Sequence, residues 1–329
     1  MTGPGNSAPQ KMAFSIDDIF LWRGVPFPPG FDALSVTESI LHAFETHGIE
    51  GVYLFSSTAP LEDDPSLARA HEMWTDAGHH IGNHGHAHAS LNWADPDAFI
   101  EDVRRSERFL SPWLEQAPRK YFRFPMDMWG DPREKTDAVL RFLVSSGYMT
   151  APATYWFYDA QFILPHTRAV TLGNDADRSK LVDLYVETGV HQYQLHRQQL
   201  TRVFDREVPL IGLAHGSAIT AEALSRYLGR LLECGVEFVS LEEAMTDPVN
   251  AYPPPISTPM FRNATQKWSE ALGHEFDGVP PTDVLLEVDA MSPIDGMDYD
   301  TVFGGMRQQA AAALGGKVDA AQFDWRKSH

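Results

Sequence analysis

The stretch Gly82-Asn83-His84-Gly85-His86-Ala87-His88-Ala89-Ser90-Leu91 decides how this chain is interpreted. Two of its histidines, His84 and His88, are four positions apart, which places them on the same side of a helical turn. Both imidazoles can then reach one divalent ion, with a carboxylate from elsewhere as the third ligand. Three protein ligands leave one coordination position open for water, which is typical of catalytic zinc-type sites. The pattern therefore predicts a metal-dependent hydrolase.

An acidic pair further upstream, in Ser15-Ile16-Asp17-Asp18, supplies the missing carboxylate. The histidine pair alone is a weak signal, because the chain has 14 histidines and such spacings arise by chance. His86 lies between the two candidate ligands, and an exchange of His86 for His84 stays open at this point. The order of further motifs along the chain decides between these interpretations.

The composition narrows the class of protein. The 329 residues are 43% hydrophobic, which is enough for one large or two ordinary domains. A formal net charge of −19 argues against nucleic acid and against anionic membranes as partners. The single cysteine, Cys234, excludes an internal disulfide and fits a reducing compartment. Because no signal peptide or membrane-spanning run is visible, we expect a cytoplasmic protein.

Stretches rich in β-forming residues alternate with amphipathic patterns, which predicts an α/β chain on a mainly parallel sheet. The expected strands cover residues 12–17, 51–56, 121–124, 148–156, 208–215 and 236–240. Helices are expected from a capping box at Ser35 to about residue 47, from Pro132 to about residue 146, and from Thr220 to about residue 233.

The candidate site residues fall at the carboxyl ends of these strands. Asp17 and Asp18 follow the first strand, and His215 ends a later one. In α/β barrels that face carries the active site. Neighbouring residues of a regular strand point to opposite faces, so Asp17 and Asp18 serve one site only if the strand bends or ends there.

The last part of the chain has a different character. Tyr252-Pro253-Pro254-Pro255 is stiff and extended, and the tail after it shows one clear helical patch, at residues 307–314. We therefore divide the chain into residues 1–250, a barrel, and residues 251–329, an extension that serves as an arm, a lid or an oligomer contact.

Five short segments, in order, resemble the motifs of the NodB-homology polysaccharide deacetylases, carbohydrate esterase family 4. Where the family has Thr-Phe-Asp-Asp-Gly and then His-x-x-x-His, this chain has Ser15-Ile16-Asp17-Asp18-Ile19 and the pair His84 and His88. Arg-x-Pro and Leu-x-His are matched by Arg123-Phe124-Pro125 and Leu213-Ala214-His215. Between those two, Tyr155-Trp156-Phe157-Tyr158-Asp159 is a loose match to an aromatic-acidic motif. The resemblance covers residues 10–247.

The resemblance implies a distorted (β/α) barrel with fewer than eight complete units. It implies that Asp18, His84 and His88 bind one divalent metal. Zn²⁺ is the first choice, and Co²⁺, Ni²⁺ and Mn²⁺ are also compatible with this ligand set. The implied general base is Asp17, held by Arg123, and the implied general acid is His215; Pro125 and Leu213 would shape the pocket.

Amide hydrolysis requires the same residue types. A metal polarises the carbonyl and lowers the pKa of bound water toward ~7, and Asp17 can take the proton of that water. A protonated His215 can then donate to the leaving nitrogen. Each residue also has a structural alternative: Asp17 as a turn cap, His215 as a buried strand-end residue, and Arg123 as a surface ion-pair partner.

Departures from the family pattern bear on the substrate. Ile19 replaces the usual glycine, and Met126-Asp127-Met128-Trp129 follows the Arg-x-Pro motif. Trp22, Trp129 and Trp156 lie in motif loops and predict an apolar, enclosed substrate site, although loop aromatics also pack on barrel rims. The acidic residue expected to tune His215 is not securely identified.

Together these features predict hydrolysis of carbon–nitrogen bonds in a small-molecule or oligosaccharide substrate, with N-deacetylation of a sugar-like compound first. The rival is hydrolysis of a cyclic amide, imide or ureide, as in allantoinase-like relatives, and esters are a further possibility. A non-catalytic binding protein is the alternative from another class. Homo-oligomer formation through the tail stays open.

Overall fold

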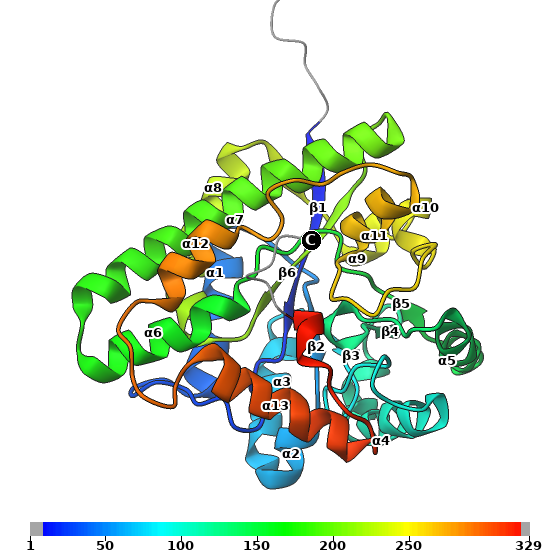
Figure 1. The fold of residues 1–329 in the computed structure, drawn as a ribbon, viewed down its shortest axis with the longest axis horizontal. Helices are drawn as coiled ribbons and strands as arrows, with labels where there is room; N and C mark the ends of the chain where they lie inside the picture. The colour runs from blue at the N-terminus through cyan, green and yellow to red at the C-terminus, as the bar shows by residue number, and fades with distance from the viewer. Residues whose placement is uncertain (1–8, 324–329) are drawn as a thin grey trace, which may run out of the picture.

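A computed structural model describes residues 9–323 of the chain. In this part a parallel sheet of seven strands forms the centre of the molecule, and its order is β5-β4-β3-β2-β1-β6, with β7 also paired to β1 (Figure 1). The strands are β1 (Gln10–Asp17), β2 (Tyr53–Ser56), β3 (His80–Asn83), β4 (Tyr121–Phe122), β5 (Met149–Thr150), β6 (Leu210–His215) and β7 (Val236–Phe238). The six predicted strands are therefore present, all except β1 shorter than expected, whereas β3, which precedes the histidine loop, was not predicted.

The segment that follows β5 closes the sheet. Tyr155 forms an isolated parallel bridge with Gly212 of β6. The backbone N–H groups of Thr154 and Tyr155 both donate to the carbonyl of Ile211 at 3.0 Å. The sheet thus curls into a distorted barrel with fewer than eight units, and the predicted fold class is confirmed.

Helices that follow the strands cover the barrel. They are α1 (Ala33–Thr46), α2 (Ala59–Asp63), α3 (Ala68–Asp76), α4 (Pro96–Leu114), α5 (Arg133–Ser145), α8 (Ala218–Glu233) and α9 (Leu241–Ala244), with short 3₁₀ turns η1 (Pro65–Leu67) and η2 (Pro125–Asp127). All three predicted helix starts differ from the structure. Pro132 is the N-cap residue of α5, which begins at Arg133. The Asp32 carboxylate caps α1 and forms a capping box with Ser35, so Ser35 is inside the helix. Similarly, Ser217 caps α8, ahead of Thr220.

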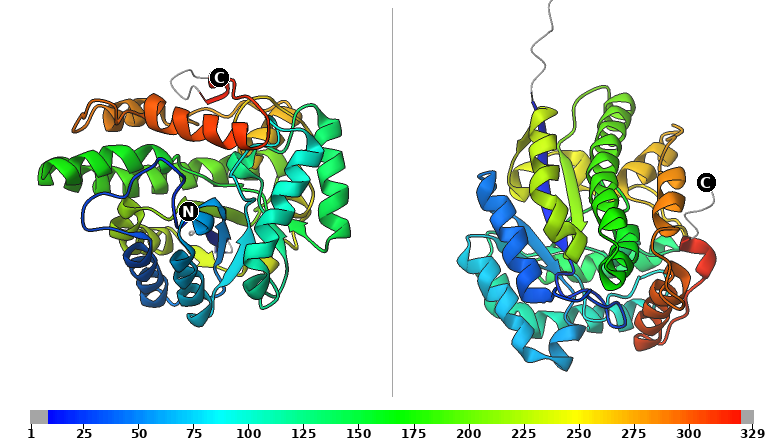
Figure 2. Two further views of the ribbon diagram at one scale, coloured as in Figure 1. Left: turned by 90° about the horizontal axis from the view of Figure 1, so that it is seen from below. Right: turned by 90° about the vertical axis from the view of Figure 1, so that its left-hand side faces the viewer.

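Two long helices that the sequence patterns did not predict, α6 (Ala160–Leu172) and α7 (Asp175–Phe204), lie between the barrel and the C-terminal extension (Figure 2). Because α7 packs against the barrel on one side and the C-terminal extension on the other, its buried residues include the polar Gln192, His196 and Gln199. The Gln192 side chain donates to Gly278 O at 2.8 Å, and Gln199 donates to Ser269 Oγ at 2.9 Å. Buried polar groups of this kind blur the apolar stripe that normally reveals a helix.

The C-terminal extension contains more structure than its sequence indicates. Besides α10 (Pro248–Ala251) it forms α11 (Ala264–Ala271), α12 (Thr282–Asp289), α13 (Tyr299–Ala313) and η3 (Ala320–Phe323). The buried guanidinium of Arg168 on α6 donates to the carbonyls of Met297, Asp289 and Met291 at 2.7–2.9 Å. Figure 2 shows this layer, orange to red, along one side of the molecule, away from α1 and α3.

Within residues 9–323, no helix combines the length and the apolar character needed to cross a membrane.

Candidate active site

Asp18, His84 and His88 lie together, buried, at the carboxyl ends of the central strands. One ligand atom from each residue lies within 4.8 Å of the others. The Oδ2 atom of Asp18 is 3.1 Å from His88 Nε2 and 3.6 Å from His84 Nε2. Asp18 directly follows β1, and its φ of +53° turns the chain away from the strand direction. This turn lets two neighbouring aspartates face one site, as the sequence required.

A loop, and not the helical turn predicted from the spacing, brings the two histidines together. Residues 84–90 follow β3 without helical structure, and His88 has a φ of +53°. The carboxylate of Asp102 on α4 holds the loop by accepting from the backbone N–H groups of His86 and Ala87, at 2.7 and 3.0 Å. Gly85 fits here because a Cβ would come within 2.8 Å of that carboxylate. Strained residues held by surrounding contacts are typical of functional sites.

Hydrogen bonds orient each side of this group. His84 Nδ1 donates to the carbonyl of Arg123 at 2.9 Å, which leaves Nε2 to face Asp18. Asp18 accepts from Trp22 Nε1 at 2.8 Å and from the Ser57 hydroxyl. Burial tends to raise the pKa of Asp18, but His88, His84 and the hydrogen bond from Ser57 hold it well below its ordinary value. Burial also lowers the pKa of His84.

The donor set therefore fits a divalent cation. One ionised carboxylate and two imidazole nitrogens converge, and deprotonated ligands of these types are what Zn²⁺ and similar ions require. His86 is turned away from the group: its ring nitrogens lie 2.9 Å from Thr58 Oγ1 and 3.2 Å from Glu62 Oε2. The exchange of His86 for His84 is thus not supported by the geometry.

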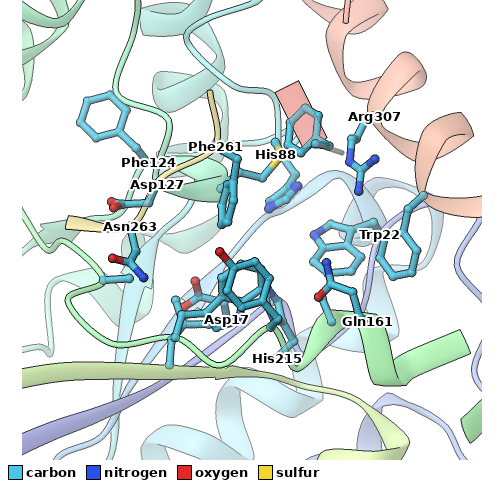
Figure 3. Close-up of a pocket in the computed structure, with 18 of the residues that line it drawn as sticks. Asp17, Trp22, His88, Phe124, Asp127, Gln161, His215, Phe261, Asn263 and Arg307 are labelled. Atoms are coloured by element: carbon cyan, nitrogen blue, oxygen red, sulfur yellow. The ribbon is translucent and has the colours of Figure 1, made fainter. Parts of the chain in front are cut away.

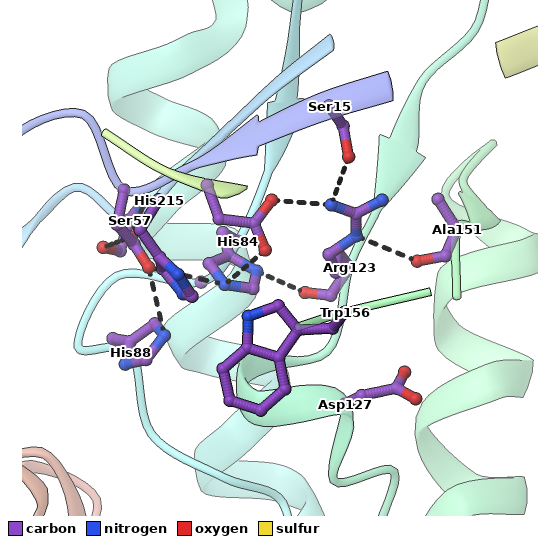
Figure 4. A network of polar contacts seen from close by, with 12 residues as sticks. Ser15, Ser57, His84, His88, Arg123, Asp127, Ala151, Trp156 and His215 are labelled. Carbon is purple, nitrogen blue, oxygen red and sulfur yellow. Dashed lines mark hydrogen bonds and ion pairs between the residues drawn. The ribbon is translucent and has the colours of Figure 1, made fainter. Parts of the chain in front are cut away.

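Asp17 is held by a buried arginine, Arg123, which directly follows β4. Arg123 Nη1 donates to Asp17 Oδ1 at 2.6 Å and to the Ser15 hydroxyl at 2.7 Å, while its Nε donates to Ala151 O at 3.2 Å (Figure 4). The guanidinium also stacks 3.9 Å over the ring of Phe55. Arg123 is only 1% exposed, so it is no surface ion-pair partner. These contacts leave the second oxygen of Asp17, 3.7 Å from His84 Nε2, facing the ligand group.

His215 has an acidic partner, Asp159, which the sequence offered only within a loose motif. His215 Nδ1 lies 3.0 Å from Asp159 Oδ1, and its backbone N–H donates to Asp159 Oδ2 at 2.6 Å. Trp156 Nε1 donates to the same carboxylate at 2.6 Å. Burial alone would lower the pKa of His215, but Asp159, with Asp17 and Asp18, raises it from 6.5 to about 9. The imidazole is therefore protonated at neutral pH.

Aromatic and polar side chains enclose a cavity at these groups (Figure 3). Of the residues predicted to bind substrate, Trp22, Trp156 and Leu213 line it, together with Asp17, His84, His88, Arg123 and His215. Pro125 and Trp129 are not among the lining residues. Trp129 stands behind the wall because it stacks on Phe124 at 4.7 Å and donates to Asp127 at 2.6 Å.

The extension completes the wall of this cavity. Its lining residues include Phe261, Asn263, Tyr299, Phe303 and Arg307. Phe303 packs edge-on against Trp22, with ring centroids 5.6 Å apart. None of these residues was predicted to have a role, because they share no motif and come near the barrel only in the folded chain. Asp102 and Ser57 escaped prediction for the same reason.

Comparison with known proteins confirms the resemblance inferred from the motifs. The model of the polysaccharide deacetylase family matches residues 10–145. This match covers β1, the histidine loop and the Arg-x-Pro segment. No curated protein sequence matches the chain.

Several solved structures are similar at low sequence identity. BA3943, a CE4 family pseudoenzyme from Bacillus anthracis, is 15% identical with a TM-score of 0.48, over 72% of this chain and 66% of that one. PdaA of Bacillus subtilis, a family 4 carbohydrate esterase, is 18% identical with a TM-score of 0.45, over 72% of this chain and 81% of that one. A family 4 acetyl xylan esterase from Clostridium thermocellum, in complex with cobalt, is 16% identical with a TM-score of 0.47, over 72% of this chain and 91% of that one.

Proposed function

We propose that the protein is a metal-dependent hydrolase of carbon–nitrogen bonds in small amides. The observation that carries this proposal is the convergence of three sets of groups on one cavity: the Asp18, His84 and His88 donors, the Asp17–Arg123 pair and the Asp159–His215 pair. A buried carboxylate and a protonated imidazole that face the same space as a metal-ligand set are typical of a catalytic site and are not required in a binding protein.

The residues divide the work of amide hydrolysis. A bound divalent ion such as Zn²⁺ supplies Lewis acidity and a water of lowered pKa. Asp17, oriented by the hydrogen bond from Arg123, accepts the proton of the attacking water. His215, kept protonated by Asp159, donates a proton to the leaving nitrogen, which cannot depart as an amide anion. Trp22 and Trp156 exclude bulk water around these groups.

The first substrate class is an N-acetylated, sugar-like small compound, which agrees with the family match. A second class, cyclic amides, imides or ureides, is favoured by the aromatic wall. Trp22, Trp156, Tyr158, Phe261 and Phe303 all line the cavity, and flat rings pack well against aromatic side chains. A panel of both substrate classes separates them: acetate release identifies the first, and ring opening the second.

The metal is tested by elemental analysis of the purified wild type and of a His84→Ala, His88→Ala double variant. We expect about one divalent ion per chain in the wild type and none in the variant, because a single carboxylate does not hold such an ion tightly. A wild type that takes up no metal from Zn²⁺, Co²⁺, Ni²⁺ or Mn²⁺ would refute the proposal.

A further inference from the structure

Arg307 occupies an unusual position for a charged residue. It comes from α13 of the extension, is only 8% exposed, and lines the cavity that holds the proposed reacting groups. Figure 3 shows its guanidinium directed into this cavity, above Trp22. Arginine stays protonated in proteins, so the cavity contains a permanent positive charge.

The contacts of Arg307 include no carboxylate within residues 9–323. Its carbon Cζ lies 4.3 Å from the ring centroid of Phe323, 4.8 Å from that of Tyr299 and 6.0 Å from that of Phe303. Its hydrogen-bond partner is the Tyr299 hydroxyl, which also accepts from Gln161 Nε2 at 3.3 Å. These neighbours hold the guanidinium in place, and the Tyr299 hydroxyl accepts a hydrogen bond from one of its edges. They do not neutralise its charge.

The other charged residues on the cavity wall have partners of opposite charge, which leaves the charge of Arg307 in excess. Each lining carboxylate has its own buried cation: Asp17 pairs with Arg123, and Asp127 pairs with Lys267. Arg262 also lines the cavity, and its nearest carboxylate, Glu270, is 4.0 Å away and largely exposed. In a chain with a net charge of −19, a cavity wall with excess positive charge is conspicuous.

We propose that Arg307 binds a carboxylate of the substrate, so that the protein acts on small amides that also carry an acidic group. The inference rests on the proposed function and names its substrate class. A planar guanidinium with free N–H groups recognises a carboxylate through paired, charge-assisted hydrogen bonds, which gives orientation as well as affinity. The acidic group bound at Arg307 would then direct the amide toward Asp17 and His215.

The test measures binding separately from turnover. N-acetylglycine and N-benzoylglycine are titrated calorimetrically against their neutral carboxamides, using metal-loaded protein that carries Asp17→Asn. We expect each carboxylate to bind at least about tenfold more tightly than its carboxamide. Adding Arg307→Gln should remove this preference and leave the Kd of the carboxamides unchanged. Arg307→Lys, which keeps the charge without the planar fork, should retain part of the preference.

Arg262→Gln is the matched control, because it removes the same charge from the same wall at a residue with a carboxylate neighbour. It should keep the preference for carboxylates. Equal binding of the two members of each pair would overturn the inference. So would an Arg307→Gln variant that weakens carboxylates and carboxamides alike, since that result shows a packing role.

Hydrolysis of the same compounds by wild type distinguishes the two proposals. A clear carboxylate preference in binding without hydrolysis of any amide leaves Arg307 as an anion site and refutes the proposed function. Hydrolysis of both members of each pair with equal kcat/KM supports the function and refutes the role of Arg307.

Discussion

The barrel and the C-terminal extension meet at one cavity and contribute different chemistry to it. The barrel contributes groups that are each fixed by a partner, such as Asp17 by Arg123 and His215 by Asp159. The extension contributes mainly aromatic rings and one arginine, Arg307, whose charge has no carboxylate partner in residues 9–323. We infer that the rigid barrel positions the reacting groups, while the added segment decides which molecules fit beside them.

The largest effect is expected from Asp17→Asn, which removes one of the proposed catalytic groups that the barrel contributes. Loss of the proposed base should lower kcat ~10²–10⁴-fold. Metal content should not change, because Asp18, His84 and His88 remain. Kinetics and elemental analysis on the same preparation measure both. Ser15→Ala, which removes a different contact of Arg123, is the control and should cost far less; a fully active Asp17→Asn variant would exclude Asp17 as the base.

The contact between the barrel and the C-terminal extension is tested by Lys267→Met. Lys267 on α11 is 2% exposed, and its Nζ binds the backbone carbonyl and the carboxylate of Asp127 in the barrel loop. Burial raises the pKa of Asp127 and lowers that of Lys267, so each charge depends on the other. Removing one partner should cost ~3–5 kcal/mol in the free energy of unfolding, measured by denaturant titration.

The double variant Lys267→Met, Asp127→Asn is the control for this experiment. It should recover part of the lost stability, because no unpaired charge remains buried. If the double variant is no more stable than the single one, the contribution of Lys267 is packing and not ion pairing.

A smaller effect, on pH dependence, is expected from Asp159→Asn. In the wild type Asp159 raises the pKa of His215, the proposed general acid, above its ordinary value of 6.5, so the rate should fall only at a pH well above 6.5. Without the Asp159 charge the alkaline limb should move down by about one to two pH units. A pH–rate profile measures this, and an unchanged limb would show that a group other than His215 controls it.

The same pair has a consequence for stability in protein stripped of metal. Because folding raises the pKa of His215 from 6.5 to about 9, its stabilising contribution is complete below pH 6.5 and is lost as the pH rises through about 9. Thermal unfolding across this window should show the decline in wild type and a weaker one in Asp159→Asn.

The smallest effect should come from Trp129→Phe. The ring stands behind Phe124 and outside the cavity, so KM should stay within about twofold of wild type while stability falls by ~1 kcal/mol through the lost hydrogen bond to Asp127. A large rise in KM would show that Trp129 reaches the substrate after all.

Local signals, the β-forming runs and capped helices, predicted an α/β chain on a parallel sheet, and the resemblance to the deacetylase family implied its distorted barrel. The sequence also placed Asp17, Asp18, His84, His88, Arg123 and His215 in one site through the order of short motifs. It failed at the helical turn assumed for His84 and His88, since a spacing of four does not distinguish a turn from a loop held by Asp102. It missed α7 because that helix is covered on two sides.

Only the tertiary structure decided the rest. Asp159 became the partner of His215 through a contact across 56 positions, and Arg307 entered the cavity because α13 folds back over the barrel. Such contacts depend on how distant elements pack, and they leave no periodicity or motif in the sequence around them. Short motifs thus predicted which polar groups lie together in the site, whereas packing between the barrel and the extension determined the wall that surrounds them.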